Sequence, residues 1–359
     1  MNDRLYFDHA ATTPVLCEAR EAMDRALESW ANPSSPHADG RRARAALEEA
    51  RHTIAAALEW RHDVILTSGA SEAIQIAAAR ARSARRIVVG PTEHDAVIAA
   101  MGNSAEVLTV GADGLIEMTA LQDALAGDPA LVAIQLVNNE TGIIQPIERI
   151  YEAVNSTGSL LLCDCAQAAG KIALPDADFV AVSGHKFGAP PGAGALLVKD
   201  FGTLAPSGGQ ERGYRRGTEN LPAAAAMAAA LESRAFAMAM PRLETLRQHL
   251  ENEIVGSGGL IIAAGAPRIA TIGAYAMPGV ASASQLVQLD LAGISVSAGS
   301  ACSSGSMKPS RVLAAMGISE EIASSVIRVS FGPSTAERHI DRFVGEWRKI
   351  AARAKAQAA

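Results

Sequence analysis

The chain has 359 residues, more than a single hydrophobic core usually supports, so we expect two domains. Hydrophobic residues make up 49% of the sequence and charged residues 19%, a balance that excludes a disordered protein. The formal net charge of -6 argues against a general nucleic-acid binder, which would carry a basic surface, and favours small molecules or proteins as partners.

The first residues lack the apolar run of a signal peptide. The most apolar long window, 222–240, is rich in alanine and contains Glu232 and Arg234, which predicts a buried helix rather than a membrane span. Four cysteines in a chain of this length, without a secretory signal, do not suggest a disulfide framework. We therefore expect a cytoplasmic protein with no membrane association.

The spacing of apolar residues predicts two amphipathic helices at the start of the chain, at 15–30 and 38–58. From Asp63 onward, short apolar runs alternate with helical segments. The expected strands are 64–67, 86–89 and 131–137, and the helix after the last of them is 147–155. This alternation predicts an α/β fold, with a mostly parallel sheet that has helices on its faces.

The pattern then changes to a long helical segment, which Pro241 should kink or divide. Shorter apolar runs mixed with helices follow, and the last helix is expected at 336–356. The apolar runs are 260–263, 269–275, 294–297 and 326–331. We therefore assign residues 14–240 to a large domain and residues 1–13 with 241–359 to a smaller α+β domain.

Two polar residues end apolar runs in the large domain. Lys186 follows the run 179–182 and has a glycine two positions away on each side, while Asp164 ends the run 160–163. A lysine after a strand is most often a solvated loop residue. If both runs are strands of one parallel sheet, the two side chains lie at carboxyl ends, where open α/β sheets bind ligands. An amine that can bond an aldehyde and a carboxylate that can hold a pyridinium nitrogen predict a pyridoxal 5'-phosphate site.

Other residues have both a functional and a structural interpretation. Ala70 and Ser71 lie between a strand and a helix, so their N–H groups and the Ser71 hydroxyl could face a phosphate, or they form an ordinary helix cap. His94 follows a strand and is either a hydrogen-bonding structural residue or an acid–base group. Asn139 ends a strand, where it could contact a ligand, or it is an ordinary turn residue.

Cysteine and arginine residues supply further candidates. Cys302 lies in a run of small residues without an apolar anchor, which favours a reactive thiol, with an incidental surface cysteine as the alternative. Cys163 and Cys165 flank Asp164 and should be buried thiols on the opposite face of the strand. A lone Cys-x-Cys pair is a poor zinc framework, so we expect no metal. Arg328 interrupts an apolar strand and needs an anionic partner.

Several motifs occur in the order in which one known family carries them. They are YFDHAATTP at 6–14, TEH at 92–94, NNETG at 138–142, DCAQAAGK at 164–171, SGHK at 183–186, GGQERGYRRGTEN at 208–220, GSACSSG at 299–305 and RVSFG at 328–332. This ordered set resembles the cysteine desulfurases, which are pyridoxal-phosphate enzymes of the class V aminotransferase group, over nearly the whole chain. The resemblance implies the fold type I transferase architecture, with a seven-stranded, mostly parallel sheet between helices and a small domain that carries a catalytic cysteine loop.

The resemblance also implies roles for single residues. Lys186 would bond the cofactor, Asp164 would hold its ring nitrogen, and His94 would stack on the ring and assist proton transfer. Cys302 would be the catalytic thiol. The other residues implied to contact the cofactor are Ala70, Ser71, Asn139, Gln167, Ser183, His185 and Thr218.

Within that set, Gln167 matches the residue that hydrogen-bonds the phenolic oxygen, and Ser183 and His185 match phosphate contacts. Thr218 matches a residue that reaches the phosphate of the neighbouring subunit, which implies a homodimer. Arg328, with Asn139, would bind the substrate carboxylate.

The implied reaction converts L-cysteine to L-alanine and leaves the sulfur on Cys302 as a persulfide. The sulfur would pass to an acceptor protein in iron–sulfur cluster assembly or tRNA thiolation, without direct binding of nucleic acid. A selenocysteine lyase and a class V aminotransferase are the alternative enzymes. A non-catalytic scaffold of the same fold is the alternative outside enzymes.

Overall fold

The computed structural model describes residues 4–28, 30–82, 84–299 and 309–358. Within these residues the chain forms a seven-stranded sheet and two smaller sheets. The strands of the large sheet are β2 (Asp63–Thr67), β3 (Arg86–Val89), β4 (Glu106–Val107), β5 (Ala130–Gln135), β6 (Leu160–Asp164), β7 (Phe179–Ser183) and β8 (Gly194–Val198).

The strands of the large sheet follow the order β2-β8-β7-β6-β5-β3-β4. β4, β3, β5, β6 and β7 are parallel to one another, and β8 is antiparallel to both of its neighbours. The predicted mostly parallel sheet is therefore confirmed. Every residue of β5, β6, β7 and β8 is buried, as expected for a sheet covered on both faces, which explains their continuous apolar runs.

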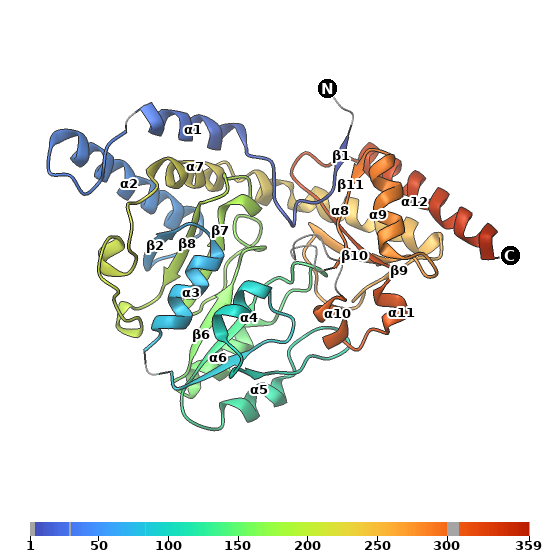
Figure 1. Ribbon diagram of the computed structural model, residues 1–359, viewed down its shortest axis with the longest axis horizontal. Coiled ribbons are helices and arrows are strands. Elements are labelled where there is room, and N and C mark those ends of the chain that lie inside the picture. The colour runs from blue at the N-terminus through green and yellow to red at the C-terminus, as the bar shows by residue number, and fades with distance from the viewer. Residues whose placement is uncertain (1–3, 29, 83, 300–308, 359) are drawn as a thin grey trace.

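Helices cover the two faces of this sheet (Figure 1). Side chains of β7 alternate between the faces: Val180 joins a core with Ile54, Ile150 and Met227, whereas Phe179 joins a second core on the other face. The helices between residues 17 and 232 are α1 (Cys17–Glu28), α2 (Ala38–Ala57), α3 (Ala70–Arg80), α4 (Asp95–Met101), α5 (Met118–Leu125), α6 (Ile147–Ser156) and α7 (Leu221–Glu232).

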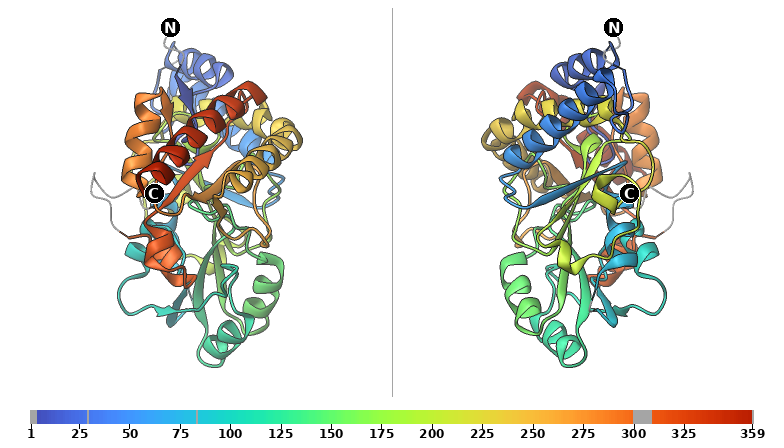
Figure 2. Two further views of the ribbon diagram at one scale, coloured as in Figure 1. Left: turned by 90° about the vertical axis from the view of Figure 1, so that its right-hand side faces the viewer. Right: turned by 90° about the vertical axis from the view of Figure 1, so that its left-hand side faces the viewer.

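The smaller sheets hold the amino terminus beside the last third of the chain. β12 (Val326–Ser330), β10 (Ile272–Ala276) and β9 (Leu260–Ile261) form an antiparallel sheet, and β1 (Leu5–Tyr6) pairs in parallel with β11 (Ile294–Ser295). The left-hand view of Figure 2 looks onto this part of the molecule. Its helices are α8 (Ala235–Gly256), α9 (Ser282–Leu291), α10 (Arg311–Ala315), α11 (Glu320–Ala323) and α12 (Glu337–Ala358).

The long helical segment is divided at Arg234 and not at Pro241. Arg234 has a left-handed backbone with φ 53°, which ends the hydrogen-bond ladder of α7, and α8 begins at the next residue and continues through Pro241. Phe236 of α8 packs in a core of the large sheet, whereas Leu243 packs in the core of the smaller sheets. α8 therefore links the two parts, and the domain boundary at residue 240 stays a prediction.

A buried ion pair ties the segment before α7 to the edge of the large sheet. The Arg51 Nη1 atom of α2 lies 2.5 Å from Glu211 Oε2, and Arg51 Nη2 donates to Glu211 Oε1 at 3.0 Å. The Leu66 N–H of β2 also donates to Glu211 Oε2 at 2.8 Å. The side chains of Arg51 and Glu211 are only 6% and 1% exposed. Arg51 Nε also lies 3.1 Å from Glu48 Oε2, a carboxylate that is 28% exposed, so Glu211 is the fully buried one of its two counter-charges.

Replacing Glu211 should test the contribution of this ion pair. We expect Glu211→Gln to lower the free energy of unfolding by about 3 kcal/mol, the lower end for a broken buried ion pair, because Arg51 would keep only the partly exposed Glu48 as a counter-charge. Urea denaturation of the purified protein measures it. Asp39→Asn is the matched control, since Asp39 pairs with Arg42 on the exposed surface and should change stability little. Equal, small effects of both substitutions would contradict the interpretation.

Candidate functional site

Lys186 follows β7 in a short 3-10 helix, Gly184–Lys186, at the carboxyl end of the strand. Its side chain is half-buried, and its Nζ atom donates to the Ala10 carbonyl at 2.8 Å and to the Ala11 carbonyl at 2.7 Å. Gly188 has φ 98°, and a Cβ atom there would lie 2.5 Å from the side chain of Leu16. Glycine is therefore required to bring the lysine loop against the amino-terminal segment.

Asp164 is the last residue of the neighbouring strand β6. Its carboxylate is buried and accepts a hydrogen bond from the Ala166 N–H at 2.9 Å. Burial raises the pKa of Asp164, and the Ala166 N–H and the charges of His94 and Lys186 oppose that rise. A carboxylate and two potential cations therefore interact at one edge of the sheet, as the sequence predicts.

Cys163 and Cys165 are fully buried, which confirms the prediction of buried thiols. Their sulfur atoms lie 3.6 Å apart, and burial is the main cause that raises the pKa of Cys163. These cysteines are therefore unreactive core residues.

No cluster of three or more potential metal ligands occurs within the described ranges. No helix in the same part of the chain is long and apolar enough to cross a membrane.

His94 and Asn139 occupy the loops after β3 and β5. The His94 Nδ1 atom caps α4 by accepting the Ala96 N–H at 3.1 Å. This hydrogen bond holds the imidazole ring at Nδ1. A charge on the ring also opposes the rise that burial causes in the pKa of Asp164. In the next loop the turn is made by Asn138, whose Oδ1 accepts the Glu140 N–H at 2.9 Å. The turn chemistry thus belongs to Asn138, and Asn139 is half-buried beside it.

The amino terminus of α3 offers uncapped N–H groups. The helix cap is Gly69 rather than Ser71, and it provides no side-chain hydrogen bond. Ala70 is buried and Ser71 is exposed in the first turn. A Cβ atom on Gly69 would lie 3.7 Å from the Ser183 hydroxyl, so the end of β7 lies next to this helix terminus. Uncapped N–H groups with a neighbouring hydroxyl suit an anion such as phosphate.

His185, Gln167 and Thr218 have distinct surroundings. The His185 Nδ1 atom lies 3.1 Å from the Thr12 hydroxyl, and burial with the charges of Lys186 and Lys171 lowers the pKa of His185 to about 4. Gln167 is buried and donates through Nε2 to the Ala10 carbonyl at 2.8 Å. Thr218 is exposed and does not join the other site residues. Cys302 lies outside the described residues.

Arg328 enters the site from β12 in the small sheet. Its guanidinium is 3% exposed and donates to the Asn139 carbonyl at 3.0 Å and to Asp8 Oδ1 at 2.7 Å. Its Nε atom is buried and has no partner among the described residues. Within the described residues Asp8 is thus an anionic partner of Arg328 that sequence reasoning did not indicate, and the substrate carboxylate as a partner stays a prediction. The signal for Asp8 was the YFDHAATTP motif, which also supplies the carbonyls that face Lys186.

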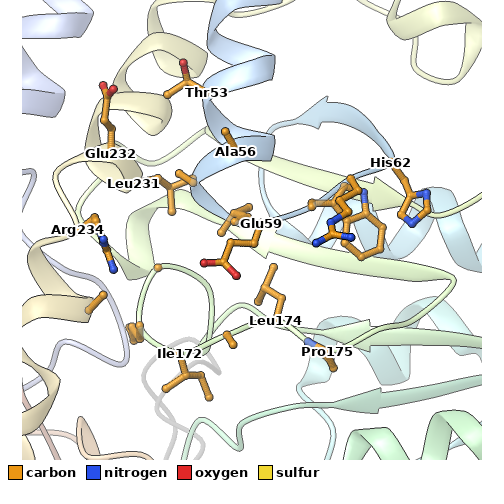
Figure 3. Close-up of a pocket in the computed structure, with 18 of the residues that line it drawn as sticks. Thr53, Ala56, Glu59, His62, Ile172, Leu174, Pro175, Leu231, Glu232 and Arg234 are labelled. Carbon is orange, nitrogen blue, oxygen red and sulfur yellow. The ribbon is translucent and has the colours of Figure 1, made fainter.

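A cavity is lined in part by Gly170, Lys171 and Ile172, which follow Gln167 in the sequence. It has a volume of about 800 Å³ and contains none of the predicted site residues in its lining. Figure 3 shows Glu59, Leu231 and Arg234 on one side of it, with Ile172 and Leu174 on the other. The candidate site is therefore identified by its chemistry and not by this hollow.

The site residues fit pyridoxal 5'-phosphate. An amine can hold its aldehyde, the buried Asp164 carboxylate can hold a protonated ring nitrogen, and the α3 terminus can hold its phosphate. Arg328, from a different sheet, can bind an α-carboxylate in the same site. This arrangement is suited to reactions at the α-carbon of an amino acid.

The buried His9 imidazole predicts a pH dependence of stability. Burial and the charge of Lys171 lower the pKa of His9 from 6.5 to about 4. Between pH 6.5 and 4, His9 is protonated in the unfolded chain but not in the folded chain. Its contribution to the free energy of unfolding is therefore fully present above pH 6.5 and is lost as the pH falls toward 4. The unfolding temperature of the cofactor-free protein should therefore fall more between pH 6.5 and 4.5 in wild type than in His9→Gln. Parallel profiles of the two proteins would contradict this assignment, because the other titrating groups are shared.

A sequence profile of the aminotransferase class-V family matches residues 5–343 of this chain. The chain is 36% identical over 369 residues to the IscS-like cysteine desulfurase of Mycobacterium tuberculosis, and the match covers 94% of this chain and 93% of that protein. It is 34% identical over 365 residues to a cysteine desulfurase of Cereibacter sphaeroides, with 95% and 94% covered.

Solved structures give the same result. A NifS-like protein from Rickettsia africae superposes with a TM-score of 0.89 at 28% identity, covering 97% of this chain and 99% of that one. SspA in complex with cysteine superposes with a TM-score of 0.78 at 29% identity, covering 92% and 100%. The fold type I architecture expected from the sequence is confirmed. The chain therefore belongs to the class-V aminotransferase family and, within it, to the cysteine desulfurases.

Proposed function

We propose that this chain is a pyridoxal-phosphate-dependent enzyme that converts L-cysteine to L-alanine and takes the sulfur onto Cys302. The observation that carries the proposal is the electrostatic interaction of the buried Asp164 carboxylate with Lys186 and His94, which follow the parallel strands β7 and β3 of the same sheet. Similarity to cysteine desulfurases over almost the whole chain supports the choice of reaction. The complex of the similar protein SspA with cysteine supports the choice of substrate.

Two residues of the large sheet provide the chemistry of the cofactor site. When bound, pyridoxal phosphate supplies an electron sink that lets an amino acid lose its α-proton. Lys186 would hold the cofactor covalently through Nζ, and its amine could accept or donate a proton at the substrate. Asp164 would hold a protonated ring nitrogen, because a cation beside its buried carboxylate would offset the cost of burial. His94 would lie against the ring.

Further residues orient the cofactor and the substrate. Ala70, Ser71, Ser183 and His185 would hold the phosphate. In the cofactor-free chain, burial and the charges of Lys186 and Lys171 lower the pKa of His185 to about 4. Gln167 would contact the phenolic oxygen.

The substrate carboxylate would bind to Arg328, whose guanidinium is already fixed by the Asn139 carbonyl and by Asp8. Asn139, half-buried beside that carbonyl, would contact both substrate and cofactor.

The sulfur transfer step belongs to Cys302. Its thiolate attacks the sulfur of the substrate, the carbon–sulfur bond breaks, and the electron pair of that bond returns to the alanine product. Cys302 is then a persulfide, whose outer sulfur passes to an acceptor protein in iron–sulfur cluster assembly or tRNA thiolation. The similarity to an IscS-like protein favours the first of these routes.

The proposal includes a homodimer in the cytoplasm. The exposed position of Thr218 supports a dimer, because a residue that reaches the phosphate of a neighbouring subunit must be accessible in the single chain. The two thiols of Cys163 and Cys165, which lie 3.6 Å apart without a bond, suit a reducing compartment.

Replacing Lys186 tests the cofactor linkage. We expect Lys186→Ala to lose the visible absorbance of the bound cofactor, to form no adduct reducible by borohydride and to have no turnover, because the covalent bond needs this amine. Absorbance spectra and mass spectrometry of the reduced protein measure these outcomes. Lys199→Ala is the control, because Lys199 is a surface lysine paired with Asp176. A reducible adduct in Lys186→Ala would contradict the assignment.

Replacing Cys302 tests the sulfur transfer. We expect Cys302→Ser to bind cofactor and L-cysteine normally but to release alanine at least ~100-fold more slowly, because a hydroxyl is far less nucleophilic than a thiolate. The measurements are alanine release and mass spectrometry of the Cys302 peptide for added sulfur. Cys17→Ser is the control at an exposed cysteine. Undiminished alanine release from L-cysteine would refute the mechanism, and loss of activity toward L-cysteine but not L-selenocysteine would indicate a selenocysteine lyase.

A further inference from the structure

Lys171 is a buried lysine that the proposed reaction does not use. It is 4% exposed and forms no ion pair within the described part of the chain. Its ammonium lies 5.2 Å from the centre of the Phe236 ring. Burying an ammonium without a counter-charge is costly, because the protein replaces the lost hydration only in part. A residue of this kind is usually retained at the expense of stability for a functional reason.

A chain of hydrogen bonds connects Lys171 to the cofactor lysine. The Lys171 Nζ atom donates to Gln167 Oε1 at 3.4 Å, and Gln167 Nε2 donates to the Ala10 carbonyl at 2.8 Å. The same carbonyl accepts Lys186 Nζ at 2.8 Å. A carbonyl oxygen has two lone pairs, so Ala10 serves both donors at once. Lys171 and Lys186 are thus separated by one amide and one carbonyl.

The ammonium fixes which way the Gln167 amide points. If the amide were flipped, its NH₂ group would face the Lys171 ammonium and its oxygen would face the Ala10 carbonyl. Both contacts would be repulsive, so one orientation is strongly favoured. Without the ammonium, only the bond to Ala10 would hold the amide, and the buried Gln167 oxygen would lose its donor.

We propose that Lys171 is a positioning residue of the cofactor site, which acts by orienting the Gln167 amide and, through the shared Ala10 carbonyl, the Lys186 amine. The proposal rests on the roles proposed above for Gln167 and Lys186. It explains why a lysine occupies a position in which an apolar residue would be more stable. Burial and the charge of Lys186 lower the pKa of Lys171 to about 7, so the two amines also interact electrostatically.

The test compares Lys171→Met, Lys171→Arg and the control Lys349→Met in the full-length protein. Lys349 offers the same side-chain change at an exposed site of α12, where it pairs with Glu346. Two quantities are measured: the unfolding temperature of the cofactor-free protein, and the dissociation constant for pyridoxal phosphate from absorbance titration. We expect Lys171→Met to unfold a few degrees higher, because a buried ammonium without a counter-charge is removed. We expect it to bind the cofactor about tenfold more weakly, because the Gln167 amide loses the donor that orients it.

Lys171→Arg keeps the charge and the donors, so its cofactor affinity should stay within about threefold of wild type. Lys349→Met should change neither quantity. A Lys171→Met protein that unfolds at a lower temperature and binds the cofactor normally would overturn the proposal, because Lys171 would then be a structural residue. Equal loss of affinity in Lys171→Arg and Lys171→Met would overturn it as well.

A double-mutant cycle shows whether Lys171 acts through Gln167. In a Gln167→Ala background, Lys171→Met should cause little further loss of cofactor affinity, because the amide it orients is absent. A full tenfold additional loss would contradict the proposed route. These outcomes are separate from the reaction assignment, which fails if Lys186→Ala retains a reducible cofactor adduct, whatever Lys171 does.

Discussion

The parallel pairing of β6 with β7 determines where the reactive groups of this protein meet. Asp164 pairs with Ala181, so β7 extends two residues beyond the end of β6 before the turn that carries Lys186. Side chains alternate between the faces of a strand, and a slip of one residue would put Cys163 in place of Asp164. The buried apolar faces of both strands prevent such a slip, because it would expose one core and crowd the other.

Charged groups in this site are stabilised by one another rather than by water. Lys186 and His94 offset the burial of Asp164, and Arg328 is held by Asp8 and a backbone carbonyl. The amino-terminal segment takes part twice, through Asp8 on the side of the small sheet and through the Ala10 and Ala11 carbonyls on the side of the large sheet. This segment therefore joins Arg328 to Lys186, although it is more than 170 residues away from either in the sequence.

Local sequence patterns were enough to predict five strands of the large sheet and the residues at the ends of β6 and β7, but not β1, β4 or the antiparallel β8. The ends of β6 and β7 could be predicted because an apolar run followed by Asp164 or Lys186 is visible in the sequence. The pairing of Asp8 with Arg328 and the bond from Gln167 to Ala10 could not, because no periodicity reports contacts across such sequence separations. The helix break at Arg234 was missed because a left-handed residue that is not glycine leaves no compositional signal.

In the proposed mechanism the Asp164 carboxylate would keep the ring nitrogen of the cofactor protonated within a buried site. The ¹⁵N NMR shift of that nitrogen reports its protonation in holoenzyme reconstituted with ¹⁵N-labelled pyridoxal phosphate, for wild type and Asp164→Asn. We expect a protonated nitrogen at neutral pH in wild type and an unprotonated one in Asp164→Asn, since an amide cannot stabilise the charge. An unprotonated nitrogen in wild type, or the same shift in both proteins, would refute the role of Asp164.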